Sequence, residues 1–134
     1  FPIGGILIHP NIKPWSGMLG TTFGGNHLAC AAGLAVLEVI DSEGLIDHVN
    51  LIGEELWNGL VSLKNMTQIR GKGLMIGLDL KEDSKSFRLR LLKDQYVFVG
   101  SAMQSNTVRL LPPLGMNKEE LVFFLEAFKK VYYA

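Results

Sequence analysis

A glycine-rich loop that runs into a helix carries the clearest chemical pattern in the sequence. Gly20–Asn26 places two adjacent hydroxyl groups, those of Thr21 and Thr22, shortly before the expected helix. Backbone N–H groups at a helix start, the positive end of the helix dipole and hydroxyl donors together suit an anion such as a phosphate. An ordinary helix-capping loop has the same residue types, and no lysine stands at Walker-motif spacing. The pattern leaves both interpretations open.

Arg109 is the second candidate for chemistry. It stands in an otherwise apolar stretch, Thr107–Leu110, which two prolines soon follow. A guanidinium in such a strand either faces solvent from a sheet edge or holds a carboxylate through its planar fork. Arg70 is a weaker candidate of the same kind, because the neighbouring Gly71 and Gly73 also suit a β-bulge or close packing of a helix.

Other kinds of chemistry find little support. His9, His27 and His48 are far apart and have no cysteine or carboxylate at ligand spacing, so no metal site is predicted. Cys30 lies in an apolar helix and is interpreted as a packing residue; a single cysteine also fits a reducing compartment such as the cytoplasm.

The 13 basic and 13 acidic residues offer no basic patch for nucleic acid or an anionic membrane. No apolar run reaches the roughly 18 residues of a membrane span.

The elements that position these residues follow from apolar spacing and capping residues. Helices are expected over Asn26–Asp41, Asp47–Lys64, Ser84–Asp94 and Leu121–Tyr132, the last with a capping box of Asn117 and Glu120. Strands are expected over Phe1–His9 (buried, or else an extended segment), Thr67–Arg70, Leu74–Leu80, Tyr96–Val99 and Thr107–Leu110. The first helix is apolar on nearly every face and should therefore pack against another domain or subunit. The order of elements predicts an α+β domain with a small, largely antiparallel sheet covered by helices.

Four blocks of sequence, in the right order, resemble the C-terminal part of the class III pyridoxal-phosphate aminotransferases. The blocks are Phe1–Gly5, Gly20–Asn26 with Leu28–Ala32, Ile69–Gly77 and Val108–Leu114. They span almost the whole chain and are most similar to the members that act on N-acylornithines.

The resemblance implies the small C-terminal domain of a fold-type I aminotransferase, preceded by a remnant of the large domain. Residues 1–25 would be the large-domain remnant, 26–44 a linking helix and 45–134 the small domain. The lysine that forms the Schiff base is expected a few residues before Phe1. No catalytic residue is therefore assigned here, and the chain alone is expected to be inactive.

Individual roles also follow from the resemblance. Thr22 would donate to the phosphate of a pyridoxal phosphate bound by the neighbouring subunit of a homodimer. Thr21 would lie near the substrate, and Arg109 would bind the substrate α-carboxylate. His27 stands where the family usually has proline, a replacement that should cost little because proline is merely favourable at a helix start.

The activity implied is transfer of an amino group from N-acetylornithine to 2-oxoglutarate in arginine biosynthesis, although enzymes for N-succinylornithine share the motifs. Two alternatives remain from the residues alone. One is a free-standing α+β module that binds an anionic small molecule without catalysis. The other is a dimerisation domain that is indifferent to ligands.

Overall fold

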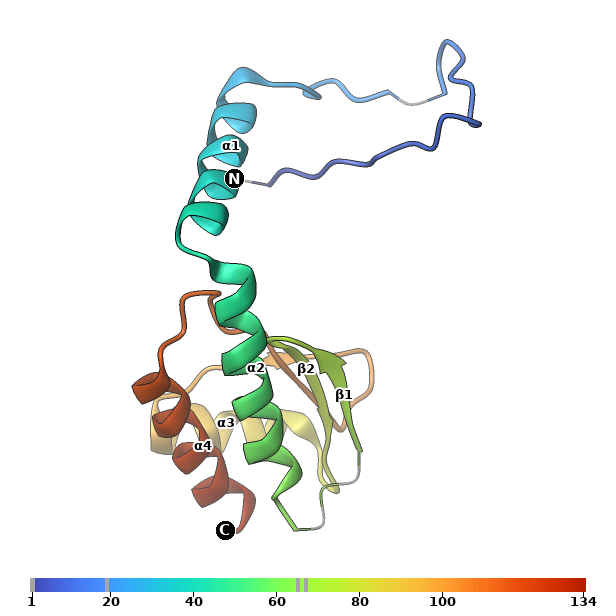
Figure 1. The fold of residues 1–134 in the computed structure, drawn as a ribbon. Helices are drawn as coiled ribbons and strands as arrows, with labels where there is room; N and C mark the ends of the chain where they lie inside the picture. Colours follow the sequence, from blue (N-terminus) through green and yellow to red (C-terminus); the bar gives the residue numbers. More distant parts are fainter. Residues whose placement is uncertain (1, 19, 65, 67) are drawn as a thin grey trace. The chain divides into compact units, whose positions relative to one another are not determined.

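The computed structural model describes residues 2–18, 20–64, 66 and 68–134. Its contacts divide the chain into two compact units, which we call unit 1 (Phe1–Glu43) and unit 2 (Gly44–Ala134) (Figure 1). No helix within the described residues is both long enough and apolar enough to cross a membrane.

Unit 1 contains the helix α1, His27–Ser42, which confirms the first predicted helix. Asn26 caps it, since its side-chain Oδ1 accepts hydrogen bonds from the N–H groups of Leu28 at 3.0 Å and Ala29 at 3.2 Å. Only Ala29 is buried, and apolar side chains such as those of Leu34 and Leu37 are exposed. Unit 1 by itself therefore leaves the apolar surface of α1 uncovered.

The buried strand expected at Phe1–His9 is wrong, and the extended alternative is the better description. Residues 2–9 are exposed and have no regular structure, while Phe1 lies outside the described residues. A strand is stable only when a partner satisfies its backbone N–H and C=O groups. The described part of unit 1 provides no such partner strand.

Unit 2 is the α+β unit that the sequence predicts. Its elements are α2 (Leu45–Val61), β1 (Gln68–Lys72), β2 (Met75–Asp79), α3 (Ser84–Gln95), β3 (Gly100–Ser101), β4 (Thr107–Leu110) and α4 (Lys118–Tyr132). The four strands form an antiparallel sheet in the order β1-β2-β4-β3. The predicted capping box is present at the start of α4, where Asn117 and Glu120 bond reciprocally.

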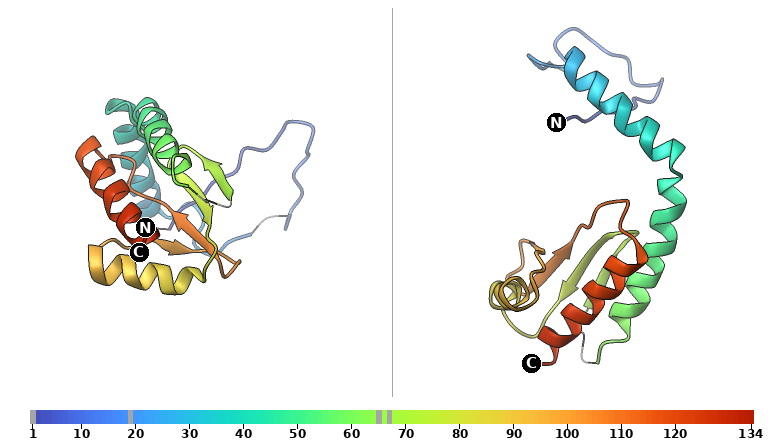
Figure 2. Two further views of the ribbon diagram at one scale, coloured as in Figure 1. Left: turned by 90° about the horizontal axis from the view of Figure 1, so that it is seen from below. Right: turned by 90° about the vertical axis from the view of Figure 1, so that its left-hand side faces the viewer.

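The sheet is amphipathic, and its buried face carries the core. Side chains alternate along a strand, so Ile76 and Leu78 of β2 point to the same face as Val108 and Leu110 of β4. The helices α2, α3 and α4 all lie on this face (Figure 2). The opposite face carries Arg70, Gly77 and Arg109, and we call it the open face of unit 2.

The strand expected at Tyr96–Val99 is wrong. Tyr96 is the C-cap of α3 and has a left-handed backbone with a φ of 56°. Its N–H donates to the Leu92 carbonyl, and the N–H of Val97 donates to the Leu91 carbonyl. These donors close the helix, so the strand begins only at Gly100.

The two glycines beside Arg70, Gly71 and Gly73, serve different contacts. A Cβ at Gly53, in α2, would lie 2.8 Å from the carbonyl oxygen of Gly73, in the turn between β1 and β2. Gly71 and Gly73 also have positive φ values of 142° and 55°. Close packing of a helix is therefore confirmed for Gly73, whereas a Cβ at Gly71 would lie 2.0 Å from the Met75 carbonyl oxygen of the neighbouring strand β2. Thr67, where β1 was expected to begin, lies outside the described residues.

Candidate active site

Two arginines lie side by side across the strands on the open face, with a glycine between them. We call such a row of register partners a level of the sheet. Gly77 on β2 is the register partner of Arg70 on β1 and also of Arg109 on β4. On its other side, Arg109 pairs with Gly100 of β3. The glycines leave this level of the sheet without side chains of their own, so the two guanidinium groups dominate its chemistry.

Arg70 is bound within the protein. Its Nη1 donates to Oδ2 of Asp79 at 2.7 Å, and its Nη2 donates to Oγ1 of Thr107 at 3.3 Å. The Thr107 hydroxyl in turn donates to Oδ1 of Asp79 at 2.6 Å. The bonds from Arg70 and then from Thr107 hold the pKa of the Asp79 carboxyl below its usual range. The bond to Asp79 raises the pKa of the Arg70 guanidinium, so both groups stay charged.

The guanidinium group of Arg109, unlike that of Arg70, is available to bind a ligand. Its side chain is exposed, and within the described part of the chain its guanidinium forms no hydrogen bond or ion pair. A free, planar guanidinium can receive both oxygens of a carboxylate at once. The structure thus shows a physical difference between Arg109 and Arg70, which the sequence pattern had marked as a weaker candidate of the same kind.

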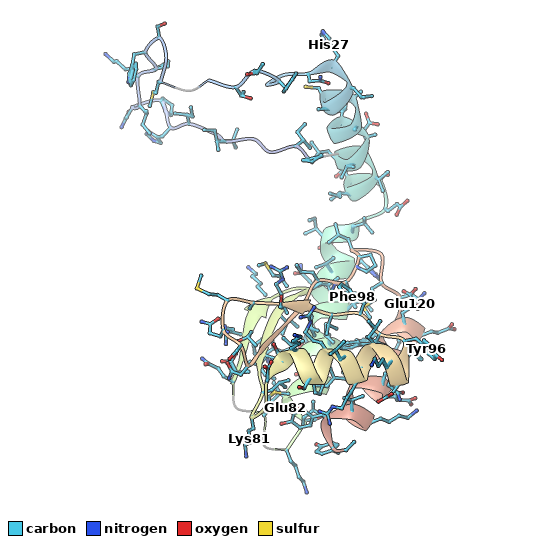
Figure 3. The ribbon with its side chains drawn as sticks, turned by 180° about the vertical axis from the view of Figure 1, so that it is seen from behind. His27, Lys81, Glu82, Tyr96, Phe98 and Glu120 are labelled. Atoms are coloured by element: carbon cyan, nitrogen blue, oxygen red, sulfur yellow. The ribbon has the colours of Figure 1, made fainter. Side chains whose placement is uncertain are left out.

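A hollow of about 420 Å³ adjoins Arg109. Its lining is apolar except for Arg109. It comes from α2, α4, the strands β3 and β4, the segment before β3 and the segment after β4: Leu56, Phe98, Val99, Gly100, Leu110, Leu111, Pro112, Pro113, Met116 and Phe124. Figure 3 shows Phe98 on one side of α3, and Tyr96 at the end of that helix opposite Lys81 and Glu82. An apolar wall beside a guanidinium strengthens its attraction to a carboxylate because it lowers the local dielectric constant.

Two contacts between main chain and side chains shape this hollow. Arg88 Nε donates to the carbonyl oxygen of Val99 at 2.9 Å, which holds the segment that leads into β3. His48 Nε2 lies 2.9 Å from the carbonyl oxygen of Met116 and ties α2 to the segment after β4. Both sides of the hollow are therefore anchored to helices.

The threonine loop belongs to unit 1. Residues 22–25 form turns, and the N–H of Asn26 donates to the carbonyl oxygen of Phe23 at 3.2 Å. Thr21 lines a hollow of about 540 Å³ together with residues 2–4 and the start of α1, whereas Thr22 is not among its lining residues. Gly24 lies against Thr21, since a Cβ there would be 2.2 Å from the Thr21 Cγ2.

The cap of α1 changes how an anion could bind to this loop. The Asn26 side chain already accepts the N–H groups of Leu28 and Ala29, which an anion at the helix start would otherwise use. The hydroxyls of Thr21 and Thr22 and the loop amides are the donors that remain. His27 is exposed at the first turn of α1 (Figure 3).

Several other sequence candidates have simple outcomes. Cys30 is exposed on α1, so its interpretation as a packing residue is wrong within this chain. Among the described residues, no three His, Cys, Asp or Glu side chains are grouped as a metal site requires.

Sequence patterns missed Asp79 and the paired glycines Gly77 and Gly100. Only their register across β1, β2, β4 and β3 brings them to the arginines.

Comparison with solved structures gives the class of protein to which this fold corresponds. Aminotransferases are among the solved structures that resemble this chain. The ornithine aminotransferase of Toxoplasma gondii aligns with a TM-score of 0.77 and 26% identity over 89% of this chain and 29% of that one. The acetylornithine aminotransferase of Elizabethkingia anophelis aligns with a TM-score of 0.72 and 30% identity over 91% of this chain and 33% of that one.

Sequence comparison then gives the family. The model of the class-III aminotransferases matches residues 1–132, and the chain belongs to that family. The acetylornithine aminotransferase of Oceanobacillus iheyensis is 37% identical over 98% of this chain and 34% of its own length. The ornithine aminotransferase of Bacillus cereus is 36% identical over 86% of this chain and 29% of its own length. The chain spans about a third of the length of the curated relatives that it matches.

Proposed function

We propose that this chain belongs to a pyridoxal-phosphate aminotransferase that moves the amino group of N-acetylornithine to 2-oxoglutarate, in the cytoplasm, as a step of arginine biosynthesis. The relatives named acetylornithine aminotransferase support the choice of donor. The observation that carries the proposal is the free guanidinium of Arg109 beside an apolar hollow. Both substrates bear a carboxylate, which such a fork is suited to hold.

The cofactor proposal rests on the family and on the threonine loop. Pyridoxal phosphate partially occupies the active site of the similar Toxoplasma gondii enzyme, and it is bound in a similar amine transaminase from an uncultivated Pseudomonas species. In this chain the exposed Thr22 shortly precedes Gly25, whose φ is 70° and whose Cβ position is open. Hydroxyl donors on an open glycine backbone suit a phosphate group.

Each candidate residue has one role in the proposed reaction. When bound, pyridoxal phosphate supplies the electron sink for amino transfer. Thr22 donates to its phosphate from the neighbouring subunit of a homodimer, and Thr21 lies near the substrate. Arg109 binds the carboxylate next to the reacting end of 2-oxoglutarate and the α-carboxylate of the donor. Its fork fixes the direction in which the rest of each substrate extends.

The division of the chain into domains is part of the same proposal. Residues 1–25 belong to the large cofactor-binding domain, 26–44 link the domains, and 45–134 form the small domain. The exposed apolar side chains of α1 support this arrangement, because such a surface is stable only when other protein covers it. The Schiff-base lysine lies outside the chain, which is inactive by itself.

An assay of the complete protein tests this function. Glutamate formation from 2-oxoglutarate is measured with N-acetylornithine, N-succinylornithine and ornithine as amino donors, in the presence of pyridoxal phosphate. We expect the highest kcat/KM with N-acetylornithine. A higher value with ornithine or N-succinylornithine overturns the substrate, and no transfer from any donor overturns the activity.

Thr22→Val is expected to weaken cofactor binding. The substitution keeps the side-chain shape and removes the hydroxyl that we assign to the phosphate, so the Kd for pyridoxal phosphate should rise about tenfold. Equilibrium dialysis with absorbance detection in the complete protein measures this Kd. Thr21→Val is the matched control and should leave the Kd near its original value. Equal Kd values for the Thr22 variant and the original protein contradict the assignment.

Gly100→Ala is expected to disturb the Arg109 fork. The added Cβ would lie 3.3 Å from Arg109 Nε and 3.2 Å from the Arg109 carbonyl oxygen, so the backbone and side chain of Arg109 must give by a few tenths of an ångström. We expect KM for N-acetylornithine to rise about tenfold, because small displacements of a positioning group cost much. Gly77→Ala is the control, since its Cβ would meet Arg70 at an ordinary 3.5 Å. Similar KM values in both variants would refute this effect.

A further inference from the structure

The geometry of the open face raises the question of why Arg70 does not compete with Arg109 for a carboxylate. Their Cα positions are two strand spacings apart, about 10 Å, with only Gly77 between them. The Arg70 side chain lies over Gly77, because a Cβ there would be 3.5 Å from both its Cγ and its Nε. Arg70 thus extends from β1 toward the strand that carries Arg109.

Asp79 and Thr107 draw the Arg70 guanidinium to the next level of the sheet. They are register partners on β2 and β4, each two residues along its strand from the level of Gly77 and Arg109. Thr107 is only 2% exposed, so its hydroxyl is a fixed point, and it donates to Asp79 while it accepts from Arg70. The Asp79 side chain is 18% exposed and carries the opposite charge. We call these three hydrogen-bonded groups, Arg70, Asp79 and Thr107, the Arg70 clamp.

We propose that Asp79 is a positioning residue for carboxylate recognition: it restrains Arg70 in the clamp and so leaves Arg109 as the one guanidinium of this level that receives the substrate. The inference rests on the proposed role of Arg109. Without the charge of Asp79, Arg70 becomes a second free cation beside the first. A carboxylate shared between two guanidinium groups still binds, but it leaves the position that orients the reacting end.

The charge state of the clamp supports this role. Because its hydrogen bonds lower the pKa of Asp79, the carboxylate stays ionised at any pH near neutrality. The charge that restrains Arg70 therefore does not change with pH near neutrality, unlike that of a histidine. A neutral asparagine side chain in place of Asp79 could still accept from Thr107 but would no longer offset the charge of Arg70.

The test compares Asp79→Asn with the original complete protein, loaded with pyridoxal phosphate. Only the half-reaction with the amino donor is followed, without 2-oxoglutarate, because Arg109 is assigned to the carboxylate of that substrate too; kcat and KM here are the limiting rate and the half-saturating donor concentration of this half-reaction. Two donors are used: N-acetylornithine and N-acetylputrescine, which has the same chain without the carboxylate. We expect kcat with N-acetylornithine to fall about tenfold while KM stays similar or falls. The rate with N-acetylputrescine should not change. A general structural defect would lower both rates together, and that result overturns the inference.

A second substitution keeps the test decisive. In Arg70→Gln combined with Asp79→Asn, the freed cation is gone, so kcat with N-acetylornithine should recover most of its loss. A double variant as slow as Asp79→Asn overturns the inference. Arg70→Gln alone should keep the preference for the carboxylated donor, and it decides the question if Asp79→Asn does not fold. Loss of the preference in Arg70→Gln would show that Arg70 itself binds the carboxylate, which also overturns the inference.

Failure of the proposed function gives a different result. If Arg109→Lys leaves the preference for the carboxylated donor unchanged, the role of Arg109 is wrong, and the clamp has no function to support. If Arg109→Lys removes the preference but Asp79→Asn changes nothing, only the inference about Asp79 fails.

Discussion

Replacing Arg109 with lysine is expected to lower kcat/KM for N-acetylornithine about a hundredfold, because lysine keeps the charge but loses the bidentate fork. The KM for 2-oxoglutarate should rise as well, since our proposal assigns the carboxylate of both substrates to the same group. Steady-state kinetics of the complete protein with each substrate varied in turn measure both effects. The apolar hollow beside Arg109 makes the loss large, because water there is a poor substitute for the missing donor.

Two controls separate this effect from damage to the fold. N-acetylputrescine has no carboxylate for Arg109, so its kcat/KM should be nearly the same in Arg109→Lys and the original protein. Arg70→Lys changes the arginine at the same level that is already bound by Asp79. It should therefore affect N-acetylornithine far less than Arg109→Lys does. Unchanged kinetics in Arg109→Lys would remove Arg109 from the site.

Phe128→Ala is expected to cost about 3–5 kcal/mol of unfolding free energy, the largest stability effect we predict. Phe128 is 0% exposed, and its ring centroid lies 4.9 Å from that of Phe87 and 5.7 Å from that of Phe124. Alanine removes this aromatic contact and leaves a cavity between α3, α4 and the sheet. Urea denaturation of the chain, followed by circular dichroism, measures the change as a lower midpoint.

Phe123→Ala on the same helix is the matched control. Phe123 is 57% exposed, so alanine there removes little buried surface and creates no cavity. Its effect should stay within about 0.5 kcal/mol, as is usual at surface positions. Comparable losses in the two variants would show that the core of unit 2 is not centred on Phe128.

Local sequence determined the elements whose signals are short-range. The helix starts at Asn26 and Asn117 were predictable, because a cap is made between residues two or three positions apart. The strand β4 was predicted with its observed bounds, Thr107–Leu110, from its β-branched residues and the prolines that follow. The order of helices and strands was sufficient for the α+β class.

Tertiary structure decided what depends on contacts between distant residues. Tyr96–Val99 has the composition of a strand. The N–H groups of Tyr96 and Val97, however, donate to carbonyl oxygens in the last turn of α3 and cannot pair with another strand. Phe1–His9 has an apolar composition, but the described residues give it no strand to pair with.

The same reason explains why the site was only half predictable. The residue pattern marked Arg70 as a weaker candidate of the same kind as Arg109, and only the family resemblance singled out Arg109. The antiparallel register brings Asp79 and Thr107, 9 and 37 residues away along the chain, to Arg70. It brings only glycines to the flanks of Arg109. Residue type thus determined that a guanidinium was present at each place, and long-range pairing decided which of the two is free to bind.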